Sequence, residues 1–356
     1  MGLPGAGAGE FEGGILTQEV VLGGKLKWSR KKYQARTEAA KCEASSQAWK
    51  VGNDVRVAFY HVLATREHVQ IENELLKTMR DRWLTVNEMF NLGQANEADK
   101  HQANVGLEKQ KLQVLAAQNN LQYTWQLLVT AVGIDIPQHE VSGNLDGEKN
   151  PIEWQSALQN VMDNSPELGE AKRKLDADII TVKREHRQPI PDVILSGGAG
   201  YDQLDAGFAA KANVNIVNIP LFDRNQGTIQ QAEADLARQR AQVELVQLQL
   251  RRLLAQHFRV YTTALQHVQS YEKVILPEAQ KRYEVMLQSY KDTRSDWPPV
   301  LEAQKDFFDL RNEYIDHQLA LRESEIAIKG FVLTGALVAP PGVTPSGHID
   351  ATPKPR

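Results

Sequence analysis

The sequence predicts a mainly α-helical protein, built from two copies of a long antiparallel coiled-coil hairpin with short β-strands beside them. Three observations predict this class. Apolar residues recur at alternating spacings of three and four over long stretches without proline. A set of residues recurs about 200 positions further along the chain. Short runs before the helices have the composition of strands, and one alternates apolar and polar residues with a period of two.

The internal repeat is clearest around two histidines. His68-Val69-Gln70 recurs as His267-Val268-Gln269, 199 residues later. Further pairs at nearly the same offset are Phe59 with Phe258, Arg82 with Arg282, Trp83 with Tyr283, Phe90 with Tyr290 and Ala103 with Ala303. A duplication predicts a first repeat over residues 15–134, a connector over 135–164 and a second repeat over 165–335. Two unrelated coiled coils of similar Gln- and Ala-rich composition are the alternative.

The first repeat begins with a strand-like run at Ile15–Leu22, followed by two glycines. A helix is predicted from Lys25 to about Asn91, where there is no proline and only Gly52 as glycine. About 60 residues of helix extend ~90 Å. A returning helix carries a seam of 3.5-residue period, typical of antiparallel coiled-coil packing: Ala103, Leu107, Gln110, Val114, Ala117, Leu121, Thr124 and Leu128.

The second repeat has the same order of elements, preceded by an extra helix and strand. The connector contains a short predicted helix at Trp154–Met162, and Ser165 and Pro166 start another that runs to about Gln188. Strands are predicted at Asp192–Tyr201 and Val214–Ile219, and Asp223 or Asn225 caps the next long helix. The last helix carries the second seam: Ala303, Phe307, Leu310, Tyr314, His317, Leu321, Ser324 and Ile328. Polar seam positions favour helices that line a wet cavity.

Composition excludes several classes of protein. Lys plus Arg number 41 and Asp plus Glu 45, so the net charge of −4 argues against a nucleic-acid binder. A single cysteine, Cys42, excludes a disulfide framework and a multi-cysteine zinc site. The sequence contains no run of about 18 consecutive apolar residues, so no transmembrane helix is predicted.

No motif of an enzyme or cofactor site is present. Gly197-Gly198-Ala199-Gly200 lies in a predicted strand and not before a helix, so it is not a phosphate loop. His68 has Glu72 one helical turn away, but His267 has Glu272 five positions away and off the same face. We therefore predict no catalytic residue, no cofactor and no metal site.

The two ends of the sequence have unusual compositions. Residues 1–9 have neither a basic segment nor an apolar one, so they are not expected to form a secretory signal. Ala6 stands where N-myristoylation requires Ser or Thr. Residues 339–356 contain five prolines and are predicted to be disordered.

Three stretches carry a resemblance to a known family. Asn164–Leu168 is similar to its helix start, Pro191–Gly198 to its strand entry and Ile219–Gly227 to its strand exit. On these residues the chain, from about 10 to 335, resembles the TolC-like outer-membrane efflux proteins, in their heavy-metal CzcC/CusC-like branch.

The resemblance implies a homotrimer in the outer membrane with a periplasmic extension. The strands of three protomers would share one β-barrel, and the hairpins would form a tunnel that docks on a periplasmic adaptor (a membrane fusion protein) and an inner-membrane pump. Metal cations or small toxic molecules would pass through this tripartite efflux system without chemistry. Family members carry four strands per protomer and a signal peptide, so we expect this chain to lack the N-terminal part of the pattern. A soluble coiled-coil scaffold or a non-functional truncated remnant is the alternative.

The resemblance also assigns roles to the hairpin turns, Leu92–Glu97 and Asp292–Trp297, as a periplasmic tip. The implied adaptor contacts are Leu92, Gly93, Gln94, Thr293 and Arg294. Charges at the aperture would be Asp99, Arg294 and Glu302, and an acidic ring there would favour cations. Solvated charges on a helix surface are the alternative for all three. Pro298-Pro299 is expected to interrupt helical hydrogen bonding beside the second turn.

Overall fold

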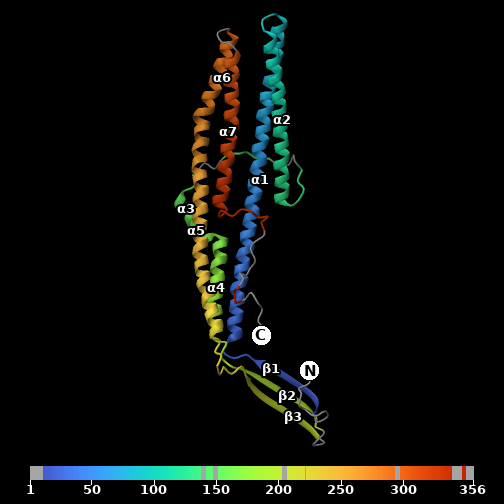
Figure 1. Ribbon diagram of the computed structural model, residues 1–356, viewed down its shortest axis with the longest axis vertical. Helices are drawn as coiled ribbons and strands as arrows, with labels where there is room; N and C mark the ends of the chain where they lie inside the picture. The colour runs from blue at the N-terminus through green and yellow to red at the C-terminus, as the bar shows by residue number, and fades with distance from the viewer. Residues whose placement is uncertain are drawn as a thin grey trace. The chain divides into compact units, whose positions relative to one another are not determined.

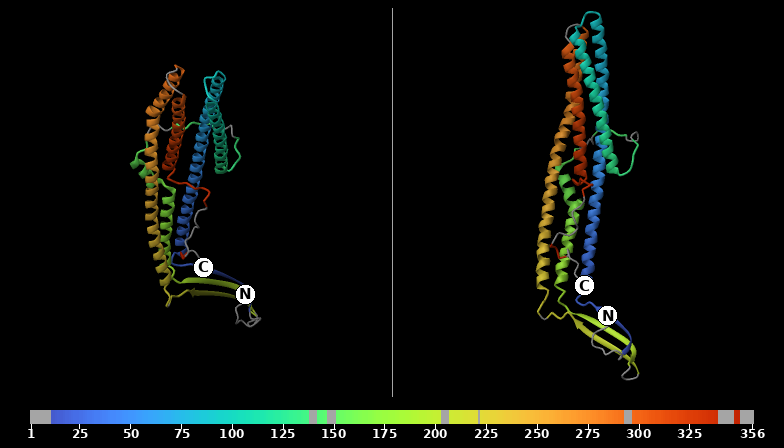
Figure 2. Two further views of the ribbon diagram at one scale, coloured as in Figure 1. Left: turned by 45° about the horizontal axis from the view of Figure 1, so that its top comes forward. Right: turned by 45° about the vertical axis from the view of Figure 1, so that its right-hand side comes forward.

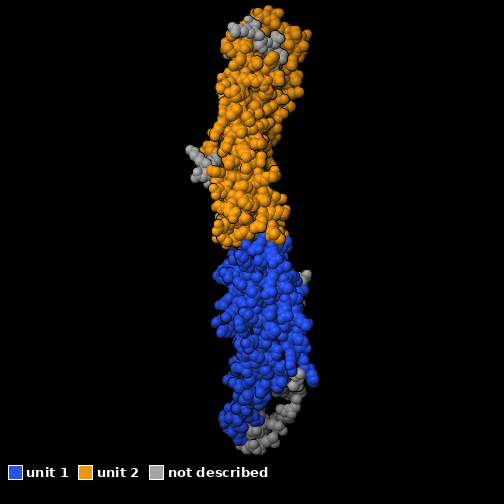
Figure 3. Space-filling model, turned by 90° about the vertical axis from the view of Figure 1, so that its left-hand side faces the viewer, with its two compact units in different colours: residues 1–44, 166–247, 340–356 blue, residues 45–165, 248–339 orange. Residues whose placement is uncertain are grey.

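The chain forms two compact units. The computed structural model describes residues 11–137, 142–146, 151–202, 207–220, 222–292, 297–338 and 347–349. Unit 1 comprises residues 1–44, 166–247 and 340–356, and unit 2 comprises residues 45–165 and 248–339 (Figure 3). Each unit takes segments from both predicted repeats, and the repeat boundaries stay a prediction.

The predicted mainly α-helical class is confirmed. Figure 1 shows the elements in chain order: β1 (Phe11–Val20), α1 (Lys25–Asn91), α2 (Glu97–Val132), α3 (Trp154–Asn164), α4 (Pro166–Glu185), β2 (Asp192–Asp202), β3 (Gly207–Val217), α5 (Gln226–Ser270), the π-helical η2 (Tyr271–Ile275), α6 (Leu276–Lys291) and α7 (Trp297–Lys329). Helices α1 and α5 contribute residues to both units.

The strands begin earlier than the sequence predicts. Strand β1 starts at Phe11 and not at Ile15, and β3 starts at Gly207 and not at Val214. The strand residues that the sequence does not predict, 11–14 and 207–213, are rich in glycine and alanine. These two residue types have low strand propensity and hide the alternation of apolar and polar residues. Pairing with β2 along the whole length imposes the strand on these residues.

The three strands form one antiparallel sheet in the order β1-β2-β3 (Figure 2). Val20 of β1 pairs with Val193 of β2, and Val193 pairs with Ile216 of β3. Strands of 10 and 11 residues match the length of a transmembrane β-strand, ~9–11 residues.

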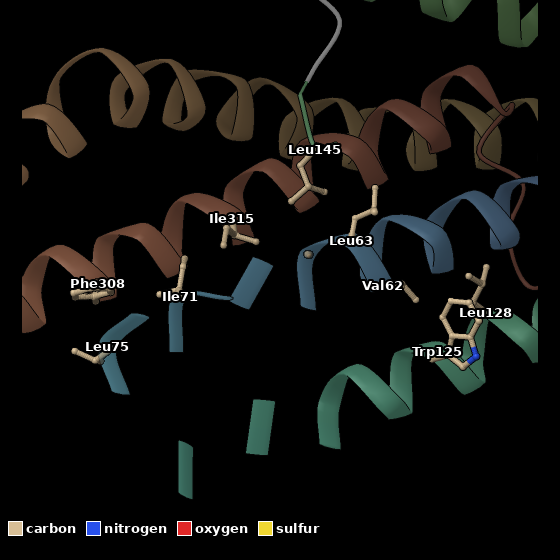
Figure 4. Close-up of a cluster of buried hydrophobic side chains, with 10 residues drawn as sticks. Val62, Leu63, Ile71, Leu75, Trp125, Leu128, Leu145, Phe308 and Ile315 are labelled. Atoms are coloured by element: carbon tan, nitrogen blue, oxygen red, sulfur yellow. The ribbon is translucent and has the colours of Figure 1, made fainter. Parts of the chain in front are cut away.

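The main core of unit 2 joins helices from both hairpins (Figure 4). Val62, Leu63, Ile71 and Leu75 come from α1, Trp125 and Leu128 from α2, Phe308 and Ile315 from α7, and Leu145 from the connector. Each buried side chain of this size contributes ~1.5–3 kcal/mol to stability. Helix α7 therefore packs against the first hairpin as well as against α6.

The polar seam residues are hydrogen-bonded. The hydroxyl oxygens of Thr124 and Thr65 lie 2.9 Å apart, and Ser324 donates to the carbonyl of Ala320 at 2.7 Å. Gln110 donates to a carboxylate oxygen of Glu72 at 2.6 Å. Pairing removes the cost of burying these groups, so the polar seam does not by itself require a wet cavity.

A buried asparagine closes the C-terminal end of α7. Asn53 of α1 is fully buried, and its amide donates to the carbonyls of Gly330 and Leu333 at 2.9 and 2.8 Å. A Cβ on Gly330 would lie 2.1 Å from the Asn53 amide nitrogen. Only glycine lets the chain pass the amide this closely.

Part of the C-terminal tail is packed in unit 1. Of residues 339–356, which the sequence predicts to be disordered, the structure describes 347–349. His348 is buried, with its Nε2 3.2 Å from Oδ1 of Asp178, and the backbone amide of Ile349 donates to Asp235 at 2.9 Å. Buried carboxylates hold these residues, and the disorder of residues 339–356 as a whole stays a prediction.

Candidate functional site

The sheet has one apolar face. Because direct cross-strand partners share a face, the register places alternate residues of the three strands together. Leucine, valine, isoleucine and aromatic side chains dominate this apolar face, together with small residues and Gln18: Leu16, Val20, Val193, Leu195, Tyr201, Phe208, Val214 and Ile216. Most of them are exposed, Leu16 at 86% and Phe208 at 79%. An exposed apolar surface of this kind requires a lipid or protein environment.

The opposite, polar face carries hydrogen-bonding and charged side chains. Thr17, Ser196 and Asn213 lie in one row across the three strands, and the hydroxyl oxygens of Thr17 and Ser196 are 3.3 Å apart. Glu19, Lys211 and Asn215 lie on this face too, as do Ile15 and Ile194. An apolar face opposite a polar one is the pattern of a barrel with lipid outside and water inside.

The glycine run of β2 lies in the sheet, as predicted. A Cβ on Gly198 would lie 2.5 Å from the carbonyl oxygen of Gly14 on β1. The run therefore allows β1 to approach β2 closely, and it opens no helix that could bind a phosphate.

A buried ion pair connects the sheet to the first helix. Lys25 Nζ at the start of α1 lies 2.8 Å from Oδ2 of Asp192 at the start of β2, and both side chains are buried. The other carboxylate oxygen of Asp192 accepts a hydrogen bond from the backbone amide of Leu22 at 2.8 Å. Sequence reasoning missed this pair, because the two residues are 167 positions apart.

The turn between β3 and α5 contains Asp223 and Asn225, which the sequence predicts as helix caps, but their side chains make other hydrogen bonds. Asn225 precedes α5, but its backbone has φ +63° and its side-chain amide donates to a carboxylate oxygen and the carbonyl of Glu185. Asp223 accepts a hydrogen bond from the backbone amide of Asn225 at 2.8 Å. Both residues organise the turn, and Asn225 links it to the end of α4.

The first hairpin turn is fixed by its own backbone. Gly93 has φ +76°, and the amides of Gly93 and Gln94 donate to the carbonyls of Phe90 and Met89. These two bonds form a Schellman motif, which ends α1. Leu92 is left with 74% of its surface exposed, on a rigid turn.

Asp99 has a clear structural role. Asn96 caps α2 by accepting from the amide of Asp99 at 2.8 Å, and Asp99 accepts in return from the amide of Asn96. This capping box accounts for an acidic residue at this position without any aperture function. Its carboxylate is nevertheless exposed beside the turn.

The second turn is described only in part. Thr293 and Arg294 lie outside the described residues. Helix α7 begins at Trp297, so Pro298 and Pro299 stand in its first turn, where backbone N–H groups have no partner within the helix. The prolines therefore mark the start of α7 and do not interrupt a helix. Glu302 is exposed on α7 beside the buried Ala303.

The two turns lie at the same end of unit 2. Tyr290, near the end of α6, donates its hydroxyl to the sulfur of Met89 at 3.5 Å, near the end of α1. Lys100 of α2 lies over the ring of Phe90, 4.8 Å from its centroid. The contact between Tyr290 and Met89 places the ends of α1 and α6 close together, and Figure 1 shows both at the same end of unit 2.

A polar layer joins the first hairpin to α7. His68 Nδ1 lies 2.8 Å from Oδ1 of Asn312, and its Nε2 lies 3.2 Å from Oδ1 of Asp316. Asn312 also donates to Glu72, which accepts from Gln110 of α2. Burial alone lowers the pKa of His68, but the hydrogen bonds to Asp316 and Asn312 outweigh it and raise the pKa. Sequence reasoning placed His68 near Glu72 and missed the partners on α7.

Two features are absent from the described residues. No group of three or more His, Cys, Asp and Glu is placed to hold a metal ion. No described helix is long and apolar enough to cross a membrane.

Comparisons with known proteins agree with this architecture. Residues 3–134 and 157–332 match the family model described as outer membrane efflux protein. The cobalt-zinc-cadmium resistance protein CzcC of Cupriavidus metallidurans is 24% identical over 304 residues, which cover 83% of this chain and 71% of CzcC.

Solved outer-membrane channels share the fold. The open state of the Neisseria gonorrhoeae MtrE channel gives a TM-score of 0.75 at 15% identity, over 92% of this chain and 80% of that one. CusC gives 0.73 at 16% identity, over 91% and 77%. VceC of Vibrio cholerae gives 0.73 at 16% identity, over 90% and 79%.

Proposed function

This chain belongs to the outer membrane efflux protein family, and on that premise we propose that three copies assemble into a conduit for divalent metal cations. As a family member it is an outer-membrane channel component of a tripartite efflux system, with a periplasmic extension and with an adaptor and a pump as partners. It is not an enzyme.

The two-faced sheet is the observation that carries the proposed trimer. A three-stranded sheet alone leaves the edges of β1 and β3 without partners, which is costly in lipid. In a barrel shared between copies these edges pair with neighbouring strands, and Phe208, Val214 and Ile216 face lipid. Lys211 and Asn213 then face water inside. If the chain were a soluble coiled-coil scaffold, the apolar face of its sheet would be left in contact with water.

The hairpin turns are the proposed contact with the adaptor. Leu92, Gly93 and Gln94 form an exposed turn whose backbone is fixed, so it can dock with little loss of conformational entropy. Thr293 and Arg294 are assigned to the same contact from the sequence alone.

Charges near the turns are the proposed aperture. Glu302 is exposed on α7, and three copies in a narrow bore would favour cations. Asp99 and Arg294 are proposed for the same aperture, Asp99 in addition to its capping role. Divalent metal cations are proposed as cargo because the relative named above is a cobalt-zinc-cadmium resistance protein.

The experiment measures metal retained by cells that carry the cognate adaptor and pump. Cells with this chain are expected to retain less Zn²⁺, Co²⁺ or Cd²⁺ than cells without it. Val214→Lys should abolish the difference, whereas Asn213→Lys, on the adjacent polar face, should keep it. Equal retention with and without the wild-type chain would contradict the proposal.

A further inference from the structure

Two histidines from different helices face each other in unit 2. His267 Nδ1 on α5 lies 3.2 Å from Nε2 and 3.4 Å from Nδ1 of His317 on α7. The ring centroids are 4.4 Å apart and the rings are nearly perpendicular. His267 is exposed and His317 is half-buried, so an ion from solvent can reach the pair.

The spacing of the ring nitrogens suits a shared metal ion. Two imidazole nitrogens bound to one tetrahedral Zn²⁺ at ~2.0–2.1 Å lie about 3.3 Å from each other. The observed distances of 3.2 and 3.4 Å bracket this value. Both distances start at Nδ1 of His267, so either ring nitrogen of His317 can supply the second ligand.

The surroundings of the pair are negative and ordered. Glu313 precedes His317 by one helical turn, and Asp316 is its neighbour in sequence. Tyr271 donates its hydroxyl to Glu313 at 2.6 Å, and its ring lies 5.0 Å from that of His317.

The backbone beside the pair is irregular. The π-helical turn η2 (Tyr271–Ile275) follows α5 directly and precedes Pro277 of α6. A proline clashes with the carbonyl four residues before it, and a widened turn avoids this clash. Such π-turns are rare and frequently occur at functional sites.

We propose that His267 and His317 form a binding site for one divalent transition-metal cation, with the remaining coordination positions filled by water. Imidazole nitrogens suit Zn²⁺, Co²⁺ and Cu²⁺. Two protein ligands give a weak, open site, which differs from a structural site with a closed set of ligands. Binding itself does not depend on the proposed function. The use of the site as a stopping point for exported metal does rest on it, since passage requires binding weak enough to release.

The test is titration of the purified full chain, without a polyhistidine tag, with Co²⁺ and with Zn²⁺. Co²⁺ is followed by its visible d–d absorption and Zn²⁺ by calorimetry. We expect saturation at one ion per chain, and at least ~10-fold weaker binding in His267→Gln and in His317→Gln. His101→Gln, an exposed histidine on α2, is the matched control and should bind as the wild type does.

Two results would overturn the site: no saturable binding, or binding unchanged by both substitutions. Circular dichroism of each variant excludes loss of the fold as the cause of weaker binding. Metal retention in cells separates the site from the proposed function. If both variants lose metal binding but cells that carry them export metal as the wild type does, the site is supported and its role in transit is overturned. Binding by a wild-type chain that does not export metal would support the site and contradict the proposed function alone.

Discussion

Tyr201 and Phe208 are direct cross-strand partners on the apolar face of the sheet, at the end of β2 and β3 where the chain passes from one strand to the other. Aromatic residues at this position match the aromatic girdle that marks the membrane interface in β-barrels. Val214 and Leu195 pair further along the same face. The aromatic pair therefore marks this end of the sheet as the one expected at a membrane interface.

A lysine in place of Val214 should prevent membrane assembly. Lysine on the lipid face of a barrel costs ~2–4 kcal/mol per protomer near the bilayer midplane, and in the proposed trimer this cost arises three times. We expect Val214→Lys to abolish the trimer band from isolated outer membranes. Asn213→Lys places the same charge on the polar face and should leave the band intact. If both variants assemble equally well, the assignment of the faces is wrong.

Removal of the Asn53 amide should destabilise unit 2. Asn53→Ala leaves the carbonyls of Gly330 and Leu333 buried without the two bonds that they accept from this amide. The expected loss is about 2–4 kcal/mol. Asn73, which is exposed and donates within its own helix, provides the control variant Asn73→Ala. Denaturant unfolding followed by circular dichroism should separate the two, and equal unfolding midpoints would contradict the prediction.

The His68 layer should make unit 2 more stable at mildly acidic pH. The pKa of His68 is raised in the folded protein, so its stabilising effect is complete below the unfolded pKa of ~6.5. The effect is lost as the pH rises through the higher folded pKa. The difference in melting temperature between wild type and His68→Gln should therefore be larger at pH 6 than at pH 8. A constant difference would show that His68 acts by packing alone.

The two roles of Asp99 can be separated by substitution. Asp99→Asn removes the charge but keeps a side-chain oxygen that can accept from the amide of Asn96, whereas Asp99→Ala removes both. If the charge lines the aperture, Asp99→Asn should lower the cation selectivity of single channels in planar bilayers, as Glu302→Gln should. Unchanged selectivity in both variants would leave Asp99 as a helix cap and would contradict the proposed acidic aperture.

A negative charge on the first turn should disrupt docking of the adaptor. Leu92→Glu is expected to weaken co-purification of the adaptor at least tenfold without changing the trimer, because an apolar contact is replaced by a solvated charge. Gln102→Glu adds the same charge on the exposed surface of α2 and serves as the control. Normal recovery of the adaptor with Leu92→Glu would remove this turn from the proposed contact.

Helix α1 and the two seams could be predicted from local patterns. Its predicted bounds, Lys25 to Asn91, are those observed, because no proline interrupts it and Gly93 ends it. Trp125 and Phe308 are buried beside the predicted seams, in one core that includes residues of α1, α2 and α7. A pattern that describes one pair of helices cannot show a third helix in the same core.

Contacts between distant residues could not be predicted. The pairs Lys25 with Asp192 and His267 with His317 depend on the packing of elements far apart in the sequence. Pro277 is a local signal for the π-helical turn, because a proline clashes with the carbonyl four residues before it. The early starts of β1 and β3 were hidden by glycine and alanine, which only pairing with β2 makes part of a strand.

Electron cryomicroscopy of the full chain, purified from outer membranes into lipid nanodiscs, tests whether the chain forms a trimeric barrel. We expect a threefold-symmetric particle with a closed β-barrel in the disc, where Phe208 and Val214 face lipid and Lys211 and Asn213 face the lumen. A monomer, or a barrel with Lys211 and Asn213 against lipid, would contradict it.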